Sequence, residues 1–360
     1  MIRKIWKNFI SSPFYKNKLV FSALLILLFF YIAIIFAEFL APYSKNYADR
    51  QLSYAPPSKI YVINEKGNLS LPYTYNYKRY FDEDTFKISF KEDKSQKYFI
   101  KLFNKGENYK FLGIFPASRH LFGVEEDGRL FLLGTDINGR DVFSRLFFGA
   151  RISLTVGFIA LFIAFPIGLL YGSISGYLGG KIDNVMMRIA EAILSIPTFY
   201  LLVILAGILP ANMTSVQRFM LITIILSFIG WAGFSRVIRG MVLSIKNSDF
   251  VVAAKTIGQR KSKIILKHII PQTMSYAIVA MTLSVPSYIL AESGLSFLGL
   301  GIQQPDASWG NMLKEAQALT TIIDRPLLLM PGILIFVAVL AFNTIGDTIR
   351  DILDPKYKRL

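Results

Sequence analysis

The sequence predicts an all-α polytopic membrane protein of six transmembrane helices, with a small β-rich external domain inserted between the first and second helices. Hydrophobic residues make up 53% of the 360 residues and charged residues only 18%, against roughly 25% charged in soluble domains. An apolar helix needs about 20 residues to cross the hydrocarbon of a bilayer. Runs of that length cover residues 19–41, 152–178, 187–209, 219–243, 276–298 and 327–349.

The distribution of basic residues predicts the orientation of these spans. Lys and Arg are enriched on the cytoplasmic side of membrane proteins, and residues 1–18 carry five basic residues and no acid. The segment 236–267 holds eight basic residues and one acid, Asp249. Both segments fall on the same side if six spans are present, which predicts cytoplasmic N- and C-termini in a cell (inner) membrane. The net charge of +16 then reflects topology, and nucleic acid is not expected as a partner.

The expected domain order follows from the spans. Residues 1–18 form a cytoplasmic N-terminus, 19–41 the first helix, 42–133 the β-rich insertion and 134–151 an external motif with a helix. Residues 152–349 form a five-helix core, with a cytoplasmic segment at 247–271, and 350–360 a cytoplasmic tail. The insertion alternates in places, as in residues 86–90 and 98–102, and carries turn signals at 65–68 and 126–128. Its tyrosines suit either contact with an external partner or a packed β core.

A stripe of small residues runs along the second span. In lipid there is little hydrophobic force between helices, so close backbone approach along such a stripe is what holds helices together. The stripe therefore predicts tight packing, within this chain or against a partner. Its members recur every four residues: Ala160, Ala164, Gly168, Gly172, Gly176 and Gly180.

The basic segment between the fourth and fifth spans is patterned as two short helices. Asp249 or the preceding serine can cap a helix over residues 250–257, and Gly258 stands where a left-handed closing residue is needed. A second helical stretch starts at Ser262, and Pro271 is expected to stop it before the fifth span. The pattern alone fits two structures: a surface for another protein, or an amphipathic helix whose lysines meet anionic lipid.

The order of residues in this segment resembles the signature loop of permease subunits of binding-protein-dependent ABC importers. That signature is Glu-Ala-Ala, three residues, Gly, nine residues, Ile-x-Leu-Pro, and this chain departs from it at Val252, His268 and Ile270. In the family, the loop forms a coupling helix that docks in a groove of the ATPase. The resemblance implies that role here for Val252, Ala253, Ala254, Lys255, Gly258 and Pro271.

Three further motifs are similar to the C-type permease of dipeptide, oligopeptide and nickel importers: Leu-Gly-Thr-Asp-Ile-Asn-Gly-Arg-Asp at 133–141, residues 295–313 and residues 342–355. In the first of these, Asp141 or Thr135 can cap the helix that enters the membrane. The resemblance covers residues 133–360 closely and implies a type I importer permease fold. It also implies a homologous second permease, two ATPase subunits, an extracytoplasmic solute-binding protein, peptide in transit and surrounding membrane lipid as partners.

The residue inventory excludes most enzymes. The chain lacks the Gly-rich phosphate loop that ends in Gly-Lys-Ser/Thr, so ATP and Mg would be used by a partner ATPase. With His120 and His268 as the only histidines and no cysteine, a zinc site is not expected. No cofactor or metal is expected on this chain.

Ionisable residues in or near the spans are the other candidates for chemistry, because charge is costly in lipid and serves pathways or partners. They are Glu38, Glu191 and Glu292. Glu292 matches an acid of the family and is expected to line the pathway or an interface. Alternatives to a peptide permease are a nickel or oligosaccharide permease of the same family, a secondary transporter that couples through these acids, and a membrane-anchored scaffold.

Overall fold

The computed structural model describes residues 17–64, 67–83, 87–125, 127–208, 210 and 213–353. Most of the basic N-terminus, parts of the turn signals at 65–68 and 126–128, the end of the predicted third span and residues 354–360 of the tail lie outside this part. The chain divides into two compact units. Unit 1 comprises Met1–Leu28, Leu154–Leu295 and Ile335–Leu360, and unit 2 comprises Phe29–Ser153 and Ser296–Leu334.

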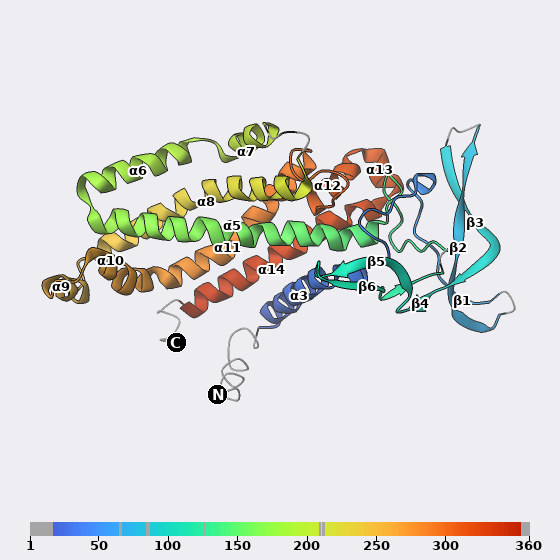
Figure 1. The fold of residues 1–360 in the computed structure, drawn as a ribbon, viewed down its shortest axis with the longest axis horizontal. Coiled ribbons are helices and arrows are strands. Elements are labelled where there is room, and N and C mark those ends of the chain that lie inside the picture. The colour runs from blue at the N-terminus through green and yellow to red at the C-terminus, as the bar shows by residue number, and fades with distance from the viewer. Residues whose placement is uncertain are drawn as a thin grey trace, which may run out of the picture. The chain divides into compact units, whose positions relative to one another are not determined.

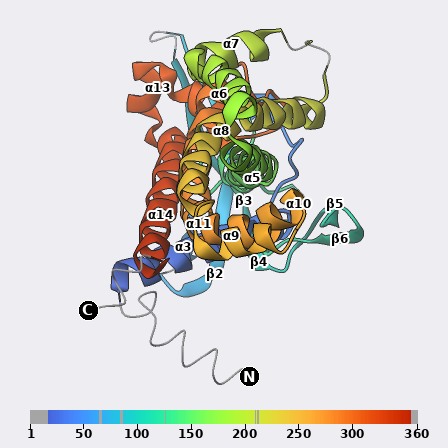
Figure 2. The ribbon, with the colours of Figure 1, turned by 90° about the vertical axis from the view of Figure 1, so that its left-hand side faces the viewer.

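Unit 1 is built of long helices, drawn in Figures 1 and 2. In the described residues, five helices are long and apolar enough to cross a membrane: Lys18–Ile35, Val142–Leu178, Gln217–Ile245, Lys261–Phe297 and Pro326–Leu353. The predicted helical membrane fold is confirmed. The elements of unit 1, some of which continue into unit 2, are α5 (Val142–Leu178), α6 (Gly180–Ser195), α7 (Thr198–Gly207), α8 (Ser215–Ile245), α9 (Asp249–Thr256), α10 (Lys261–Ile264), α11 (Ile270–Phe297) and α14 (Met330–Leu353).

The prediction of one continuous third span over residues 187–209 is wrong. Helix α6 ends at Ser195 and α7 begins at Thr198. Between them Ile196 is extended, with φ −82° and ψ 122°. The residue before a proline is driven out of the helical region by the proline ring, so Pro197 ends α6 rather than bending a single helix.

The prediction that Pro271 stops the preceding helix is also wrong. Lys261–Phe297 runs through that residue, because a π-helical stretch, η2 (Ile265–Ile269), lies just before it. The Ile270 N–H donates to the carbonyl of Ile265, five residues back instead of four. This wider turn precedes the proline, which has no N–H to donate and whose ring crowds an ordinary helical turn.

The glycine stripe of α5 lies against α8. A Cβ atom added at Gly168 would come within 2.9 Å of the Trp231 carbonyl oxygen, and one at Gly176 within 2.8 Å of the Arg239 carbonyl oxygen. At Gly172 the added Cβ would overlap the Ser235 carbonyl oxygen. The two backbones therefore approach so closely that hydrogen is the only side chain that fits, as expected for small-residue contacts in membranes.

Unit 2 contains the β-rich insertion that the sequence predicts. Strands β1 (Tyr61–Ile63), β2 (Leu69–Asp82) and β3 (Lys87–Phe99) form an antiparallel sheet in that order. Two further antiparallel pairs join β4 (Lys101–Leu102) to β7 (Phe122–Gly123), and β5 (Lys105–Phe111) to β6 (Phe115–Arg119). The helical elements of this unit are the end of α3 (Lys18–Ile35), α4 (Ala37–Leu40), η1 (Arg50–Leu52), the start of α5, α12 (Trp309–Leu313), η3 (Lys314–Gln317), α13 (Leu319–Asp324) and η4 (Pro326–Leu329).

Several tyrosines of the insertion belong to its core. The ring of Tyr43 stacks on that of Tyr47 at 4.3 Å between centroids, and both pack beside buried Phe131. Tyr98 is buried in a second cluster with Val124 and Leu130. Buried aromatic area of this kind holds together a small domain in a sequence that has no cysteine.

Candidate functional site

The segment 247–271 in unit 1 holds most of the predicted site residues. Helix α9 ends as predicted at Gly258, whose φ is +74°. The Gly258 N–H donates to the Lys255 carbonyl at 3.0 Å, and the Gln259 N–H donates to the Ala254 carbonyl at 3.1 Å. These two bonds form a Schellman motif, which requires a left-handed residue at this place. A Cβ at Gly258 would meet nothing within 4 Å.

Helix α9 has one buried face and one exposed apolar face. Val251 and Ala254 are buried, and the Lys255 ammonium lies 5.3 Å from the centre of the Tyr177 ring. The opposite face consists of Phe250, Val252, Ala253 and Ile257, all exposed. Figure 2 shows α9 at the near end of unit 1. An apolar face on a charged, exposed segment is typical of a surface that another protein covers.

The other predicted residues of this segment lie beyond α9. His268 Nε2 donates to Gln259 Oε1 at 3.0 Å, and this bond connects the end of the Schellman turn to η2. Pro271 is exposed in the first turn of α11. The exposed face of α9 is thus bordered by a segment in which Lys261, Lys263 and Lys267 are also exposed.

An ion pair that the sequence reasoning missed lies at this end of unit 1. The Arg239 guanidinium donates through Nε to Asp183 Oδ1 at 3.0 Å and through Nη2 to Oδ2 at 2.6 Å, and Ser175 Oγ donates to Oδ1 at 2.5 Å. The bonds from Arg239 lower the pKa of Asp183, although burial opposes them. This bidentate network fastens α5, α6 and α8 together. Asp183 and Arg239 are 56 positions apart, so no local pattern of the sequence predicts their pairing.

Each of the three acids in or near the spans forms an ion pair or a hydrogen bond with another residue. Glu191 pairs with Arg188 at 3.2 Å on the exposed surface of α6. Arg151 donates to both oxygens of Glu38, at 2.6 and 2.7 Å. Although burial opposes ionisation, these bonds lower the pKa of Glu38. Glu292 is buried, with Ser293 Oγ 3.4 Å from its Oε2.

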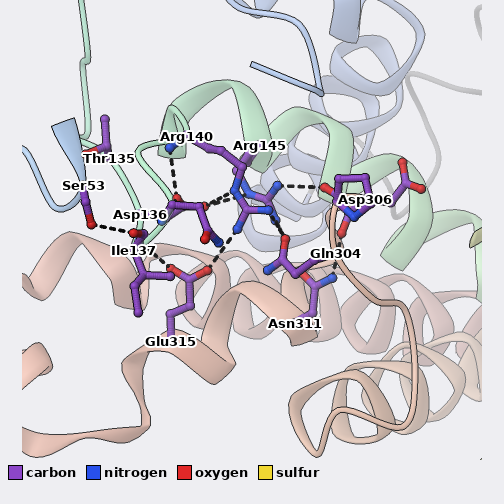
Figure 3. Close-up of polar contacts among 12 residues, drawn as sticks. Ser53, Thr135, Asp136, Ile137, Arg140, Arg145, Gln304, Asp306, Asn311 and Glu315 are labelled. Carbon is purple, nitrogen blue, oxygen red and sulfur yellow. Dashed lines mark hydrogen bonds and ion pairs between the residues drawn. The ribbon is translucent and has the colours of Figure 1, made fainter. Parts of the chain in front are cut away.

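Four charged residues and one glutamine of unit 2 form a cluster that we call the arginine cluster: Asp136, Arg140, Arg145, Gln304 and Glu315 (Figure 3). Arg140 Nε lies 2.7 Å from Asp136 Oδ2, and Arg145 Nε lies 3.4 Å from the same oxygen. Arg140 also pairs with Glu315 at 3.3 Å, and both arginines donate to the side-chain oxygen of Gln304. The first and second family-like motifs thus meet in one network. Its members Asp136, Arg140 and Arg145 are buried, whereas Glu315 is half-buried and Gln304 is exposed.

Trp309 fixes the second motif against the start of α5. Its indole Nε1 donates to the Leu146 carbonyl and its backbone N–H to Ser153 Oγ, both at 3.1 Å. The side chains of Ser308 and Asn311 form a reciprocal capping box at the start of α12. This part of unit 2 is therefore rigid, with hydrogen bonds that satisfy the buried polar groups of the loop.

Asp141 caps α5, as the sequence predicts. Thr135 does not, because its hydroxyl donates to the Leu52 carbonyl instead. One Asp141 oxygen accepts from the Ser144 N–H at 2.8 Å and from Ser144 Oγ at 2.6 Å. The other oxygen has no hydrogen-bond partner among the described residues. Burial, with a smaller contribution from nearby Asp136, raises the pKa of Asp141 to about 7.

We expect unit 2 to lose stability as the pH rises through 7. The folded chain holds a proton on Asp141 that the unfolded chain releases near pH 4, so folding is favoured most at low pH. Each pH unit between about 4 and 7 changes the free energy of unfolding by up to about 1.4 kcal/mol. The melting temperature of the purified chain should therefore fall from pH 5.5 to pH 8.

Asp141→Asn is the matched variant, because the amide oxygen still caps α5 and carries no charge. The pH dependence of its melting temperature should be shallower than that of the parent chain. Equal slopes in the two proteins would mean that Asp141 is ionised in the folded state throughout this range.

Comparison with known proteins adds two family matches and a set of relatives. Residues 168–359 match the binding-protein-dependent transport system inner membrane component, and residues 3–57 match the N-terminal TM domain of oligopeptide transport permease C. The dipeptide transport system permease protein DppC of Bacillus subtilis (strain 168) is 46% identical over 228 residues, which cover 63% of this chain and 69% of that protein.

Two more relatives and two solved structures are also similar to this chain. The oligopeptide transport system permease protein OppC of Haemophilus influenzae is 44% identical, over 62% of this chain and 70% of that protein. The glutathione transport system permease protein GsiD of Shigella sonnei is 37% identical, over 70% and 77%. An amino acid ABC transporter and the MetNI methionine ABC transporter align with TM-scores of 0.41 and 0.40, each at 19% identity, over 60% and 57% of this chain and 94% and 96% of theirs.

Proposed function

The chain belongs to the family of binding-protein-dependent transport system inner membrane components, and on that premise we propose that it is a permease subunit of an ATP-driven importer of dipeptides or oligopeptides. It forms half of the translocation pathway, and a homologous permease forms the other half. Relatives named for dipeptide, oligopeptide and glutathione transport favour a peptide over nickel or an oligosaccharide.

The exposed apolar face of α9 carries the proposal. It faces away from unit 1, beside exposed lysines. Of the two alanines that match the family's coupling loop, Ala253 lies on this face, whereas Ala254 is buried. We propose that an ATPase subunit covers this face and that the partner, not this chain, binds ATP and Mg. Val252 stands where the family has Glu, and as an exposed residue it adds to the apolar contact instead of supplying a charge.

The mechanism follows from how α9 is attached. The Asp183–Arg239 ion pair fastens α8 to α5 and α6, and α9 follows directly after α8. On its other side α9 leads through α10 and η2 into α11. Closure of two ATPase subunits around ATP would move α9, and with it the ends of α8 and α11, so that the pathway opens on the opposite side. An external solute-binding protein would deliver the peptide there.

The same premise assigns the sides of the membrane. We propose that the N- and C-termini and α9 are cytoplasmic in a multi-pass inner-membrane protein, and that the β-rich insertion and the arginine cluster are external. Glu292, buried in unit 1, would serve an internal contact of the spans.

Gly258→Asp tests the coupling assignment. The position has open space around an added Cβ, and Asp and Asn both tolerate a left-handed backbone better than most residues. The chain should therefore fold and insert with either substitution. A charge against an apolar interface costs several kcal/mol, so we expect Gly258→Asp to reduce co-purification of the ATPase by roughly tenfold or more.

Gly258→Asn is the control, because it adds a side chain of the same size without the charge. It should retain most of the co-purifying ATPase and of the peptide-stimulated ATP hydrolysis. Co-purification of Gly258→Asp at the yield of the parent chain would show that the end of α9 is not at the interface.

A further inference from the structure

The β5–β6 hairpin of unit 2 exposes an apolar turn next to the end of a membrane span. Leu112, Ile114 and Phe115 are 50, 72 and 60% exposed. Lys105, Lys110 and Arg119 on the two strands are exposed as well. A turn of a water-soluble hairpin is ordinarily polar. Three large apolar side chains at this turn therefore indicate that an apolar partner covers it.

The backbone conformation of this turn is also unusual for leucine at position 112. Leu112 and Gly113 have φ of 53° and 74°, and the Ile114 N–H donates to the Phe111 carbonyl at 3.1 Å. Hairpin turns with two successive positive φ angles favour Asn-Gly. Leucine has a side chain that disfavours the left-handed region. The turn therefore contains an apolar residue where both solvation and backbone conformation favour a polar one.

The hairpin runs back along α4 toward the membrane. Beyond β6, His120 Nδ1 contacts the Ala41 carbonyl at 2.6 Å, which places the open end of the hairpin beside the end of α4. At the other end of β5, the Phe111 ring lies 5.4 Å from the ring of Phe36. Phe36 directly follows α3. At a helical rise of about 1.5 Å per residue, it lies about 7 Å closer to the span than Ala41 does. Figure 1 shows the hairpin near the end of α3.

The exposed residues of α3 in unit 2 continue this apolar surface. Phe29 and Ile32 are exposed on one face of α3, and exposed Phe36 follows the helix at the next such spacing. Because α3 is a candidate membrane span of high hydropathy, we expect that face to meet lipid. It ends at Phe36, and the ring contact with Phe111 extends it onto the hairpin turn.

We propose that the β5–β6 turn inserts into the lipid–water interface of the leaflet in which α3 ends, and anchors the inserted domain to the bilayer. Leu112, Ile114 and Phe115 enter the acyl boundary, and Lys110, beside the turn, lies at the level of the phosphates. Arg119, which pairs with Lys105 at the open end of the hairpin, lies farther from the bilayer. Apolar side chains with flanking basic residues are the pattern of interfacial membrane contacts. This anchor fixes the domain relative to the membrane surface independently of what the importer carries.

Depth-dependent quenching tests the anchor directly. The chain has no cysteine, so Ile114→Cys labelled with an environment-sensitive fluorophore reports on one position. With the full chain, co-expressed with its partners and placed in nanodiscs, nitroxide on the upper acyl chain should quench most of the signal and aqueous iodide little. Ser95→Cys, on exposed strand β3 of the same domain, is the control and should show the reverse.

Leu112→Asn in the Ile114→Cys background adds a second measurement. Asparagine favours the turn, so the hairpin stays folded while the apolar cluster is reduced, and quenching by the nitroxide lipid should fall. Strong iodide quenching at position 114 would overturn the proposal in favour of an exposed loop. Protection from both quenchers would overturn it in favour of a protein partner that covers the turn.

Discussion

We expect Ala253→Arg to abolish co-purification of the ATPase and peptide uptake, while the chain still inserts into the membrane. Ala253 lies near the middle of the exposed face of α9, between Val252 and Ile257 around the helix. An arginine there has no partner within an apolar contact, and its bulk separates the two surfaces. A loss of about 3 kcal/mol or more of binding free energy, over a hundredfold in affinity, is the expected scale.

Asn184→Arg supplies the matched control for this variant. Asn184 is exposed on α6, next to the Asp183 that pairs with Arg239, and outside the α9 face. It introduces the same side chain at the same end of unit 1 and should leave both co-purification and uptake near the parent level. If Ala253→Arg keeps its ATPase, or if both variants lose it equally, α9 is not the specific contact.

The second large effect is expected at Gly172. In Gly172→Ala the new methyl group overlaps the Ser235 carbonyl oxygen, a backbone atom that moves only if α5 and α8 separate. Overpacking of a tight contact typically costs about 1–3 kcal/mol, and separation of the helices also loses the dispersion contacts of the adjoining glycines. The melting temperature in detergent should fall by several degrees, and less chain should reach the membrane.

Gly240→Ala separates this packing effect from helix propensity. Gly240 lies in α8 with nothing within 4 Å of an added Cβ. Alanine in a helix is favoured over glycine by about 1 kcal/mol, so this variant should melt at the same temperature or higher. Equal destabilisation of the two variants would mean that α5 and α8 do not approach as closely as the structure shows.

Much of the helical fold could be predicted from the sequence, because hydropathy and span length act locally. Five of the apolar runs correspond to helices of sufficient length, and the alternating pattern of the insertion corresponds to strands. The two errors both concern proline. Pro197 ends a helix, whereas Pro271 is accommodated inside one, and the difference depends on whether a preceding π-helical turn forms. That choice depends on packing around η2, which the sequence does not display.

The candidate site was predictable where short-range order determines it. Gly258 at the end of α9 follows from capping. The sequence did not distinguish the two alanines assigned to coupling, of which Ala253 is exposed and Ala254 is buried. The Asp183–Arg239 ion pair and the arginine cluster join residues far apart in the chain. No local pattern specifies such pairs, because they depend on which helices become neighbours.

Uptake by reconstituted proteoliposomes tests the central claim most directly. The chain, its second permease and its ATPases would be inserted with ATP enclosed, and labelled di- and oligopeptides added outside with and without the solute-binding protein. We expect peptide accumulation that requires both ATP and the binding protein and that vanadate inhibits. Accumulation that is insensitive to vanadate and depends on a proton gradient would contradict the importer assignment and identify a secondary transporter.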